Sequence, residues 1–163
     1  MASLSPSDLK TGPDAILFVN VGDANGSQYR EQLSQHGVET MDYDFFTPQS
    51  TMGAKFYYFR NVFHNWSDAK ASEILRNLAP AMEPGYSALL IADYILPTEG
   101  AQLQGPVEDI LMMWTCNALE RTSKHYEALL SPEELALNIT NISYVGSSEE
   151  DIIKVEKVKS LSY

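Results

Sequence analysis

Apolar residues along the chain gather in short continuous runs, and these runs alternate with segments whose apolar residues recur at helical spacing. Continuous apolar runs are typical of buried parallel strands. They cover residues 15–21, 55–63 and 87–94. The clearest helical segment follows the second run: Ser67 is suited to an N-cap, Asp68 supplies early negative charge, and apolar positions recur until Pro84. The pattern therefore predicts strands that alternate with helices.

Further segments continue this alternation. Helices are predicted at 27–36, 107–119 and 123–130, and an extended segment is predicted at 38–46. Near the C-terminus, two β-rich segments at 139–145 and 151–158, joined by a turn at 146–148, predict an antiparallel pair of strands. Such an order of elements is typical of an α/β fold. We expect a three-layer α/β/α sandwich of Rossmann-like type, with a mostly parallel sheet and an antiparallel C-terminal pair.

Length and charge restrict the possible functions. The 163 residues suffice for one domain with a core, and we expect a flexible segment at 1–13 followed by a domain at 14–163. The net charge of −11 disfavours binding to nucleic acid or to anionic membranes. The N-terminus has no secretory pattern, and no apolar run approaches the roughly 20 residues of a membrane span, so a cytoplasmic protein is expected. With one cysteine and three scattered histidines, no metal site is expected.

A turn that contains glycine follows the first predicted strand. Gly22 and Gly26 have the position of a nucleotide-binding loop, in which glycines let the backbone approach a ligand at the N-terminus of the next helix. Two glycines also suit a purely structural turn. The sequence leaves both interpretations open, and we prefer the structural turn.

A histidine stands where the second predicted strand ends. His64 precedes the helix cap, and parallel strands place such residues at the carboxyl edge of the sheet, where ligands bind. A histidine with its usual pKa of about 6.5 accepts a proton at neutral pH, and a carboxylate on its other nitrogen stabilises the imidazolium. Asp93 and Glu120 are candidates for this carboxylate. The alternative is a histidine that only packs or caps at the strand end.

The run at 59–68, together with Asp93 and Glu120, resembles the catalytic domain of plant and fungal O-methyltransferases that depend on S-adenosylmethionine (SAM). The resemblance is close over residues 44–130. It implies a methyltransferase fold in which His64 is the general base that takes a phenolic proton. It also implies that Asp93 and Glu120 orient this base.

The same resemblance assigns residues to the cofactor and to the substrate. It implies that Asp44 and Phe45 lie around the adenine of SAM and that Arg60 lies beside the cofactor, with the two glycines of the loop also binding it. The helix at 107–119 corresponds to a helix that lines the substrate. The implied substrate residues are Trp66, Asp109, Met112, Met113 and Asn117. Methionine and aromatic residues at helical spacing are also typical of a packed core, which stays the alternative.

Several departures from the family pattern concern the cofactor. Asp23 and Ala24 stand where the family has glycines, and Asn20 stands where it has an acid. Only residues 27–43 separate the loop from Asp44, which leaves room for one helix and one strand, so one strand–helix unit is missing. Asp23 adds a negative charge where SAM presents its own carboxylate, and a β-carbon where the backbone must approach closely. We therefore expect either no SAM or weakly bound SAM.

The family also carries a helical N-terminal domain that dimerises and covers the substrate pocket. This chain begins shortly before its first strand, so the apolar face at 107–119 is expected to lack that cover. An exposed apolar face of this kind generally becomes an interface. We therefore expect a homo-oligomer or a partner protein bound through this helix.

Three functions are compatible with these observations. The preferred one is a methyltransferase-fold protein of fungal secondary metabolism that has lost methyl transfer. It would use His64 to catalyse the cyclisation or isomerisation of a small aromatic or polyketide-like metabolite, or an elimination from it. The second is a minimal SAM-dependent O-methyltransferase, in which Asp42 or Asp44 replaces the missing ribose acid. The third is a non-catalytic partner subunit of a full-length enzyme, and fold analogy alone does not rank the three.

Overall fold

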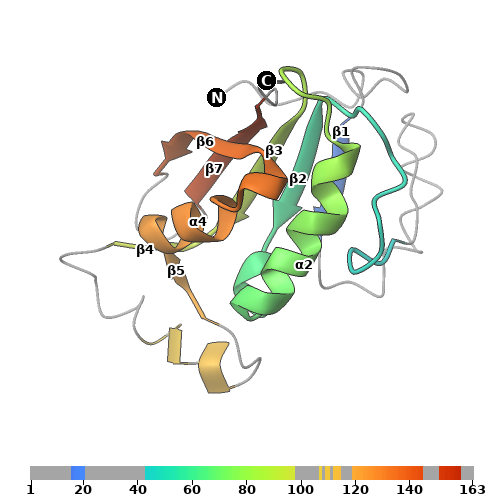
Figure 1. The fold of residues 1–163 in the computed structure, drawn as a ribbon. Helices are drawn as coiled ribbons and strands as arrows, with labels where there is room; N and C mark the ends of the chain where they lie inside the picture. Colours follow the sequence, from blue (N-terminus) through green and yellow to red (C-terminus); the bar gives the residue numbers. More distant parts are fainter. Residues whose placement is uncertain are drawn as a thin grey trace, which may run out of the picture.

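A five-stranded sheet is the main element of the computed structural model, which describes residues 16–20 as backbone and residues 43–97, 107, 109–110, 112–114, 119–144 and 151–158. The strand order is β1-β2-β3-β7-β6 (Figure 1). These strands are β1 (Ile16–Asn20), β2 (Phe56–Arg60), β3 (Ala88–Asp93), β6 (Leu137–Ser143) and β7 (Asp151–Lys157). The first three run parallel, whereas β7 is antiparallel to both β3 and β6. The predicted parallel strands and the antiparallel C-terminal pair are thereby confirmed.

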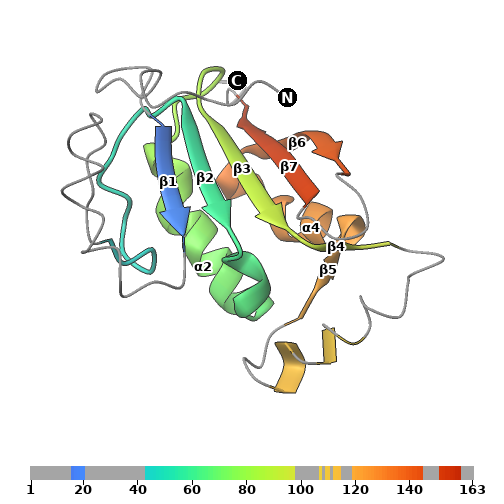
Figure 2. The same cartoon turned by 180° about the vertical axis from the view of Figure 1, so that it is seen from behind.

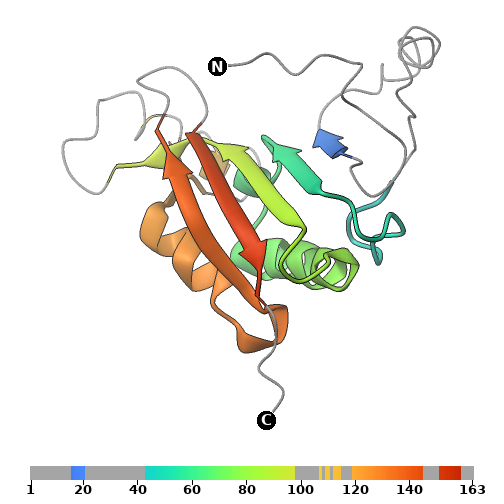
Figure 3. The same cartoon turned by 90° about the horizontal axis from the view of Figure 1, so that it is seen from above.

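Two helices cover one face of this sheet. α2 (Asp68–Leu78) and α4 (Ser123–Leu130) lie on the same side, as the views from the front, from behind and from above agree (Figure 1, Figure 2 and Figure 3). Short 3₁₀ turns are η2 (Phe63–Asn65), η3 (Ala79–Ala81) and η4 (Glu133–Leu135). Residues 109–110 and 112–114 are helical, in agreement with the helix predicted at 107–119. The helix predicted at 27–36 lies outside the described residues.

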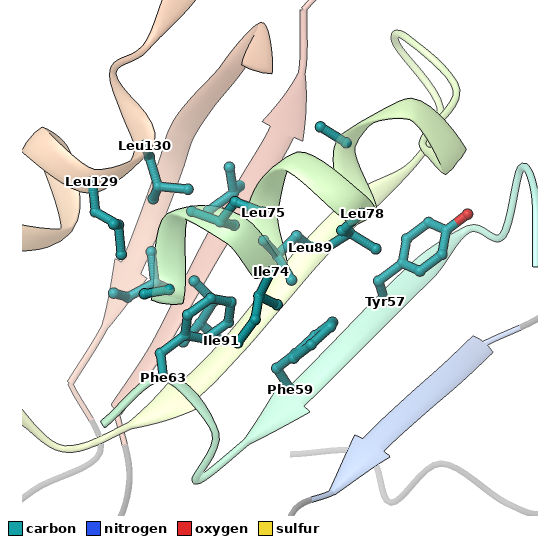
Figure 4. Packing of buried hydrophobic residues seen from close by; sticks show 14 of the residues in the cluster. Tyr57, Phe59, Phe63, Ile74, Leu75, Leu78, Leu89, Ile91, Leu129 and Leu130 are labelled. Atoms are coloured by element: carbon teal, nitrogen blue, oxygen red, sulfur yellow. The ribbon is translucent and has the colours of Figure 1, made fainter. Parts of the chain in front are cut away.

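The core lies between the sheet and these helices. Alternate residues of a strand point to the same face, so the buried positions of β2, β3 and β7 form rows across the sheet. The two rows are Tyr57, Leu89 and Val155, and Phe59, Ile91 and Ile153, all at most 1% exposed. Against them pack apolar side chains of both helices, namely Ile74, Leu75, Leu78, Leu129 and Leu130 (Figure 4). The helical spacing of apolar residues in α2 thus matches its buried face, whereas the continuous apolar run of β3 is buried on both faces of the sheet.

Two elements end earlier than the sequence predicts. β2 stops at Arg60 because Asn61 has a φ of 52°, in the left-handed region, which turns the chain out of the strand. α2 stops at Leu78 because Pro80 has no N–H to continue the helical hydrogen bonds. Ser67 is the N-cap of α2, as predicted.

A small parallel pair of strands lies beyond the end of β3. β4 (Ile95–Leu96) pairs with β5 (Arg121–Thr122). Asp93 is the last residue of β3, and Glu120 directly precedes β5. The pairing therefore brings Glu120 to the part of the molecule where β3 ends.

Candidate active site

The carboxyl ends of three parallel strands meet at one edge of the sheet. Asn20 and Arg60 end β1 and β2, and they are in register with Ala92, the last but one residue of β3. The turn after β2 is tied to this edge, because the backbone N–H of Asn61 donates to the carbonyl of Ala92 at 3.0 Å. The turn η2 follows and carries His64. His64 therefore lies at the carboxyl edge, where open α/β sheets bind their ligands.

A hydrogen bond to Glu120 orients the imidazole of His64. Nδ1 of His64 lies 3.0 Å from Oε1 of Glu120, and the two side chains are 16% and 3% exposed. An ionised carboxylate only accepts hydrogen bonds, so Nδ1 is assigned the proton and Nε2 carries the lone pair. The backbone N–H of Glu120 donates to Oδ1 of Asp109 at 2.9 Å, which ties this segment to the helical residues 109–110. The arrangement leaves Nε2 as the atom that can take a proton from a ligand.

The electrostatic surroundings of His64 favour its charged form. Burial lowers the pKa of His64, but the hydrogen bond to Glu120 and the negative charges of Asp93 and Glu120 together outweigh burial and the opposing charge of Arg121. The pKa of His64 is therefore raised above its usual value of 6.5. A base with such a pKa holds an accepted proton more firmly than a free imidazole does.

Asp93 has a different hydrogen-bond partner from the one that the resemblance implies. The hydroxyl of Tyr126 donates to its Oδ2 at 2.7 Å, and its Oδ1 is buried without a hydrogen-bond partner among the described residues. Burial raises the pKa of Asp93 to about 6, although the Tyr126 hydrogen bond and the charge of His64 lower it. Asp93 thus raises the pKa of His64 through its charge, whereas the hydrogen-bond partner of the imidazole is Glu120.

Arg121 and Tyr126 were not among the residues predicted for the site. The guanidinium of Arg121 is buried and binds the backbone carbonyls of Phe63 and Trp66, at the start of η2 and just after it, and Tyr126 is 0% exposed. From the sequence, an arginine between two predicted helices is expected at the surface, as for Arg121. A tyrosine on an amphipathic helix is expected in the core, as for Tyr126. The only sequence signal for Arg121 is its place directly after Glu120 in a run that resembles the family.

The residues assigned to the adenine form a group beside α2. Asp44 is exposed, and its Oδ1 accepts a hydrogen bond from the backbone N–H of Phe46 at 2.9 Å, so the end of the segment predicted as extended is a turn. The rings of Phe45 and Trp66 lie edge to face with their centroids 6.0 Å apart, and those of Phe46 and Trp66 lie 4.8 Å apart. Trp66 therefore packs with the cofactor candidates, although the resemblance assigned it to the substrate. Arg60 is exposed at the end of β2.

Three of the remaining candidates lie outside the described residues, namely Gly22, Gly26 and Asn117. Met112 is partly buried, whereas Met113 and Trp114 are 52% and 84% exposed. These two side chains are therefore not core residues. The expected interface through this helix stays a prediction.

In the part of the chain that the structure describes, no helix is long and apolar enough to cross a membrane. Within the same residues, no three side chains of the metal-ligating kinds lie together as a metal site would require.

Comparison with protein families and curated proteins gives one family. A family model for the O-methyltransferase domain matches residues 20–134. Demethylsterigmatocystin 6-O-methyltransferase of Emericella nidulans is 33% identical over 166 residues, which cover 88% of this chain and 80% of that protein. A methyltransferase of Aspergillus candidus is 31% identical over 169 residues, which cover 90% of this chain and 42% of that protein.

Solved structures of the same fold agree. OxaC in complex with sinefungin and meleagrin is 30% identical with a TM-score of 0.75, over 89% of this chain and 36% of OxaC. LepI in complex with SAM is 27% identical with a TM-score of 0.72, over 89% of this chain and 43% of LepI. The chain thus spans less than half the length of OxaC, LepI and the Aspergillus candidus protein. The methyltransferase fold predicted from the sequence is confirmed, and the chain belongs to the O-methyltransferase family.

Proposed function

We propose that this chain is a methyltransferase-fold protein of fungal secondary metabolism that uses His64 as a general base on a small aromatic or polyketide-like metabolite. The reaction class is cyclisation, isomerisation or elimination, with methyl transfer lost, and the protein acts in the cytoplasm. The observation that carries this proposal is the 3.0 Å hydrogen bond between Nδ1 of His64 and the buried carboxylate of Glu120. That pair needs no cofactor to move a proton.

The chemistry follows from the orientation of the imidazole. Nε2 of His64 takes a proton from a hydroxyl or an activated carbon of the substrate, and the electron pair stays on the substrate. The carboxylate of Glu120 stabilises the imidazolium that forms, because the hydrogen bond becomes charge-assisted. The electron pair then closes a ring, shifts a double bond or expels a leaving group. The imidazolium returns its proton to the product or to the leaving group, so protons balance over the cycle.

The described residues fit one end of SAM. The exposed Asp44 and the aromatic group of Phe45, Phe46 and Trp66 provide a carboxylate and ring faces suited to a purine. The loop that would meet the methionine end of SAM lies outside the described residues, and its sequence carries Asp23 where the family has glycine. SAM supplies an activated methyl group when it binds.

The comparisons offer support for chemistry other than methylation on this fold. A pericyclic reaction enzyme is 27% identical to this chain, with a TM-score of 0.71 over 89% of this chain. A pericyclic reaction rearranges bonds in one concerted step without a methyl transfer, so this neighbour supports rearrangement chemistry on the fold but not the role of His64.

A second candidate is a minimal SAM-dependent O-methyltransferase. It is favoured by the Emericella nidulans relative, a 6-O-methyltransferase of which this chain covers 80%. Under this alternative, His64 takes the phenolic proton, and Asp42 or Asp44 binds the ribose.

Mass spectrometry separates these candidates. The protein is incubated with a panel of hydroxylated aromatic polyketides, with and without SAM. An unchanged mass with a new retention time, or the loss of water, is expected without SAM, whereas a gain of one CH₂ that requires SAM would establish the second candidate instead. His64→Ala should lower the turnover by about 10² to 10⁴, the usual contribution of general acid–base catalysis, while the protein stays folded. Turnover that His64→Ala leaves unchanged would refute the role of His64, and the absence of any product over the panel would favour the partner-subunit alternative.

A further inference from the structure

Arg121 is a buried charge that joins segments distant in the sequence. Its side chain is 0% exposed, and its guanidinium donates four hydrogen bonds of 2.6–3.0 Å. Nη1 donates to the carbonyl of Phe63, and Nη2 donates to the carbonyl of Trp66. Nε and Nη2 both donate to Oδ1 of Asp68, at the first residue of α2. All three partners lie more than 50 residues before Arg121 in the sequence.

These contacts lie close in the sequence to His64, the residue that carries the proposed chemistry. Phe63 precedes His64 as the first residue of η2, and Trp66 directly follows that turn, so the guanidinium binds the backbone before and after His64 in the sequence. Arg121 directly follows Glu120, so the same arginine belongs to the segment that carries the carboxylate partner. Two carbonyls and one carboxylate oxygen are bound by a single planar group, whose donors have a fixed geometry. The Arg121 side chain therefore adds a direct link between the two segments to the backbone pairing of β4 with β5.

We propose that Arg121 is a positioning residue that fixes the distance between His64 and Glu120 through its hydrogen bonds to the backbone of Phe63 and Trp66. The proposal rests on the proposed function only in that His64 is taken as the base. The geometric claim concerns the His64–Glu120 hydrogen bond itself and can be tested without any substrate.

The charge of Arg121 and its geometry affect His64 in opposite directions. The groups that shift the pKa of His64 are Glu120, Asp93 and Arg121, besides burial. The positive charge of Arg121 lowers that pKa, whereas the Glu120 hydrogen bond, which Arg121 is proposed to maintain, raises it. A lysine at this position keeps the charge but cannot reproduce the planar fork of donors. The lysine variant therefore separates the two effects.

The experiment is an NMR titration of the imidazole of His64 in Arg121→Lys, in the full chain, with His64→Gln used to assign its signals. The pKa of His64 should fall relative to the unsubstituted protein, and the population with the proton on Nδ1 should decrease as the hydrogen bond to Glu120 loosens. Arg76→Lys is the matched control, because Arg76 forms a surface ion pair with Glu134 at 3.6 Å and both side chains are more than half exposed. This control should leave the pKa and the tautomer unchanged.

Asp68→Asn keeps the proposal testable if Arg121→Lys does not fold. Asp68 is 70% exposed, so its substitution removes the negative charge from the Arg121–Asp68 ion pair without burying a new group. The expected change has the same direction as in Arg121→Lys and is smaller, since the carbonyls of Phe63 and Trp66 still hold the guanidinium. Folded variants in which the pKa and tautomer of His64 stay as in the unsubstituted protein, or in which the pKa rises, would overturn the proposal. Because the titration uses no substrate, its result is independent of whether His64→Ala affects turnover.

Discussion

The protonation of Asp93 should make the stability of this protein depend on pH in a defined way. Asp93 is 1% exposed, and burial raises its pKa from 3.8 to about 6. Asp93→Asn keeps the shape of the side chain, and its amide oxygen can still accept the hydrogen bond that Tyr126 donates. The substitution therefore removes the ionisation and leaves most of the packing in place.

The magnitude follows from the two pKa values. A carboxyl group with a higher pKa in the folded state than in the unfolded state holds its proton more tightly when folded. Below about pH 4 the group is protonated in both states, and its ionisation does not lower the free energy of unfolding. The loss of free energy grows as the pH rises from about 4 to about 6, and it is constant at higher pH. The gap between 3.8 and about 6 corresponds to about 3 kcal/mol at 1.36 kcal/mol per pKa unit. The free energy of unfolding of Asp93→Asn, relative to that of the unsubstituted protein, should thus rise by about 3 kcal/mol as the pH increases from about 4 to about 8.

Urea unfolding followed by circular dichroism measures this difference at several pH values. Any cost of the buried amide N–H₂ in the variant is independent of pH over this range. The substitution also removes a charge that raises the pKa of His64, so the change with pH reports the coupled ionisation of Asp93 and His64. Asp44→Asn makes the same chemical change at an exposed position and corrects for the loss of one carboxylate from the chain. A stability difference between Asp93→Asn and the unsubstituted protein that stays constant with pH would refute a raised pKa at Asp93.

Three further predictions concern the imidazole, the core and the cofactor. Glu120→Gln should lower the pKa of His64, so the pH at which turnover is half-maximal should fall and turnover should weaken; a pH profile that does not move would contradict the hydrogen bond as the cause. Tyr57→Phe should cost about 1–3 kcal/mol in urea unfolding, because the buried backbone N–H of Ala54 loses its acceptor, and a loss below about 0.5 kcal/mol would disagree with that. Asp23→Gly should tighten SAM binding in calorimetry, whereas an unchanged affinity would point to the missing strand–helix unit.

The sequence alone determined much of the fold and the main site candidate. The apolar runs of β1, β2 and β3, the helical spacing of α2 and the antiparallel pair β6 and β7 are local patterns, so the sequence specifies these elements and, for α2, the face that is buried. The position of His64 followed in the same way, because a residue after a parallel strand must lie at the carboxyl edge. One boundary was not predictable: Asn61 has a left-handed φ, so β2 ends three residues before the predicted end. An asparagine adopts this conformation in some places and not in others, so its presence in the sequence does not predict the turn.

Only the tertiary structure decided which groups surround the histidine. Glu120 lies 56 residues after His64, and the short pair β4 and β5 brings the two together with no local signal. Asp93 bonds to Tyr126 rather than to the imidazole, because α4 packs its tyrosine against the end of β3. The burial of Arg121 likewise depends on backbone carbonyls, which every residue possesses, so no side-chain pattern could reveal its partners. Local patterns therefore specify the elements and, for α2, the buried face, whereas hydrogen bonds between distant segments exist only once the chain has folded.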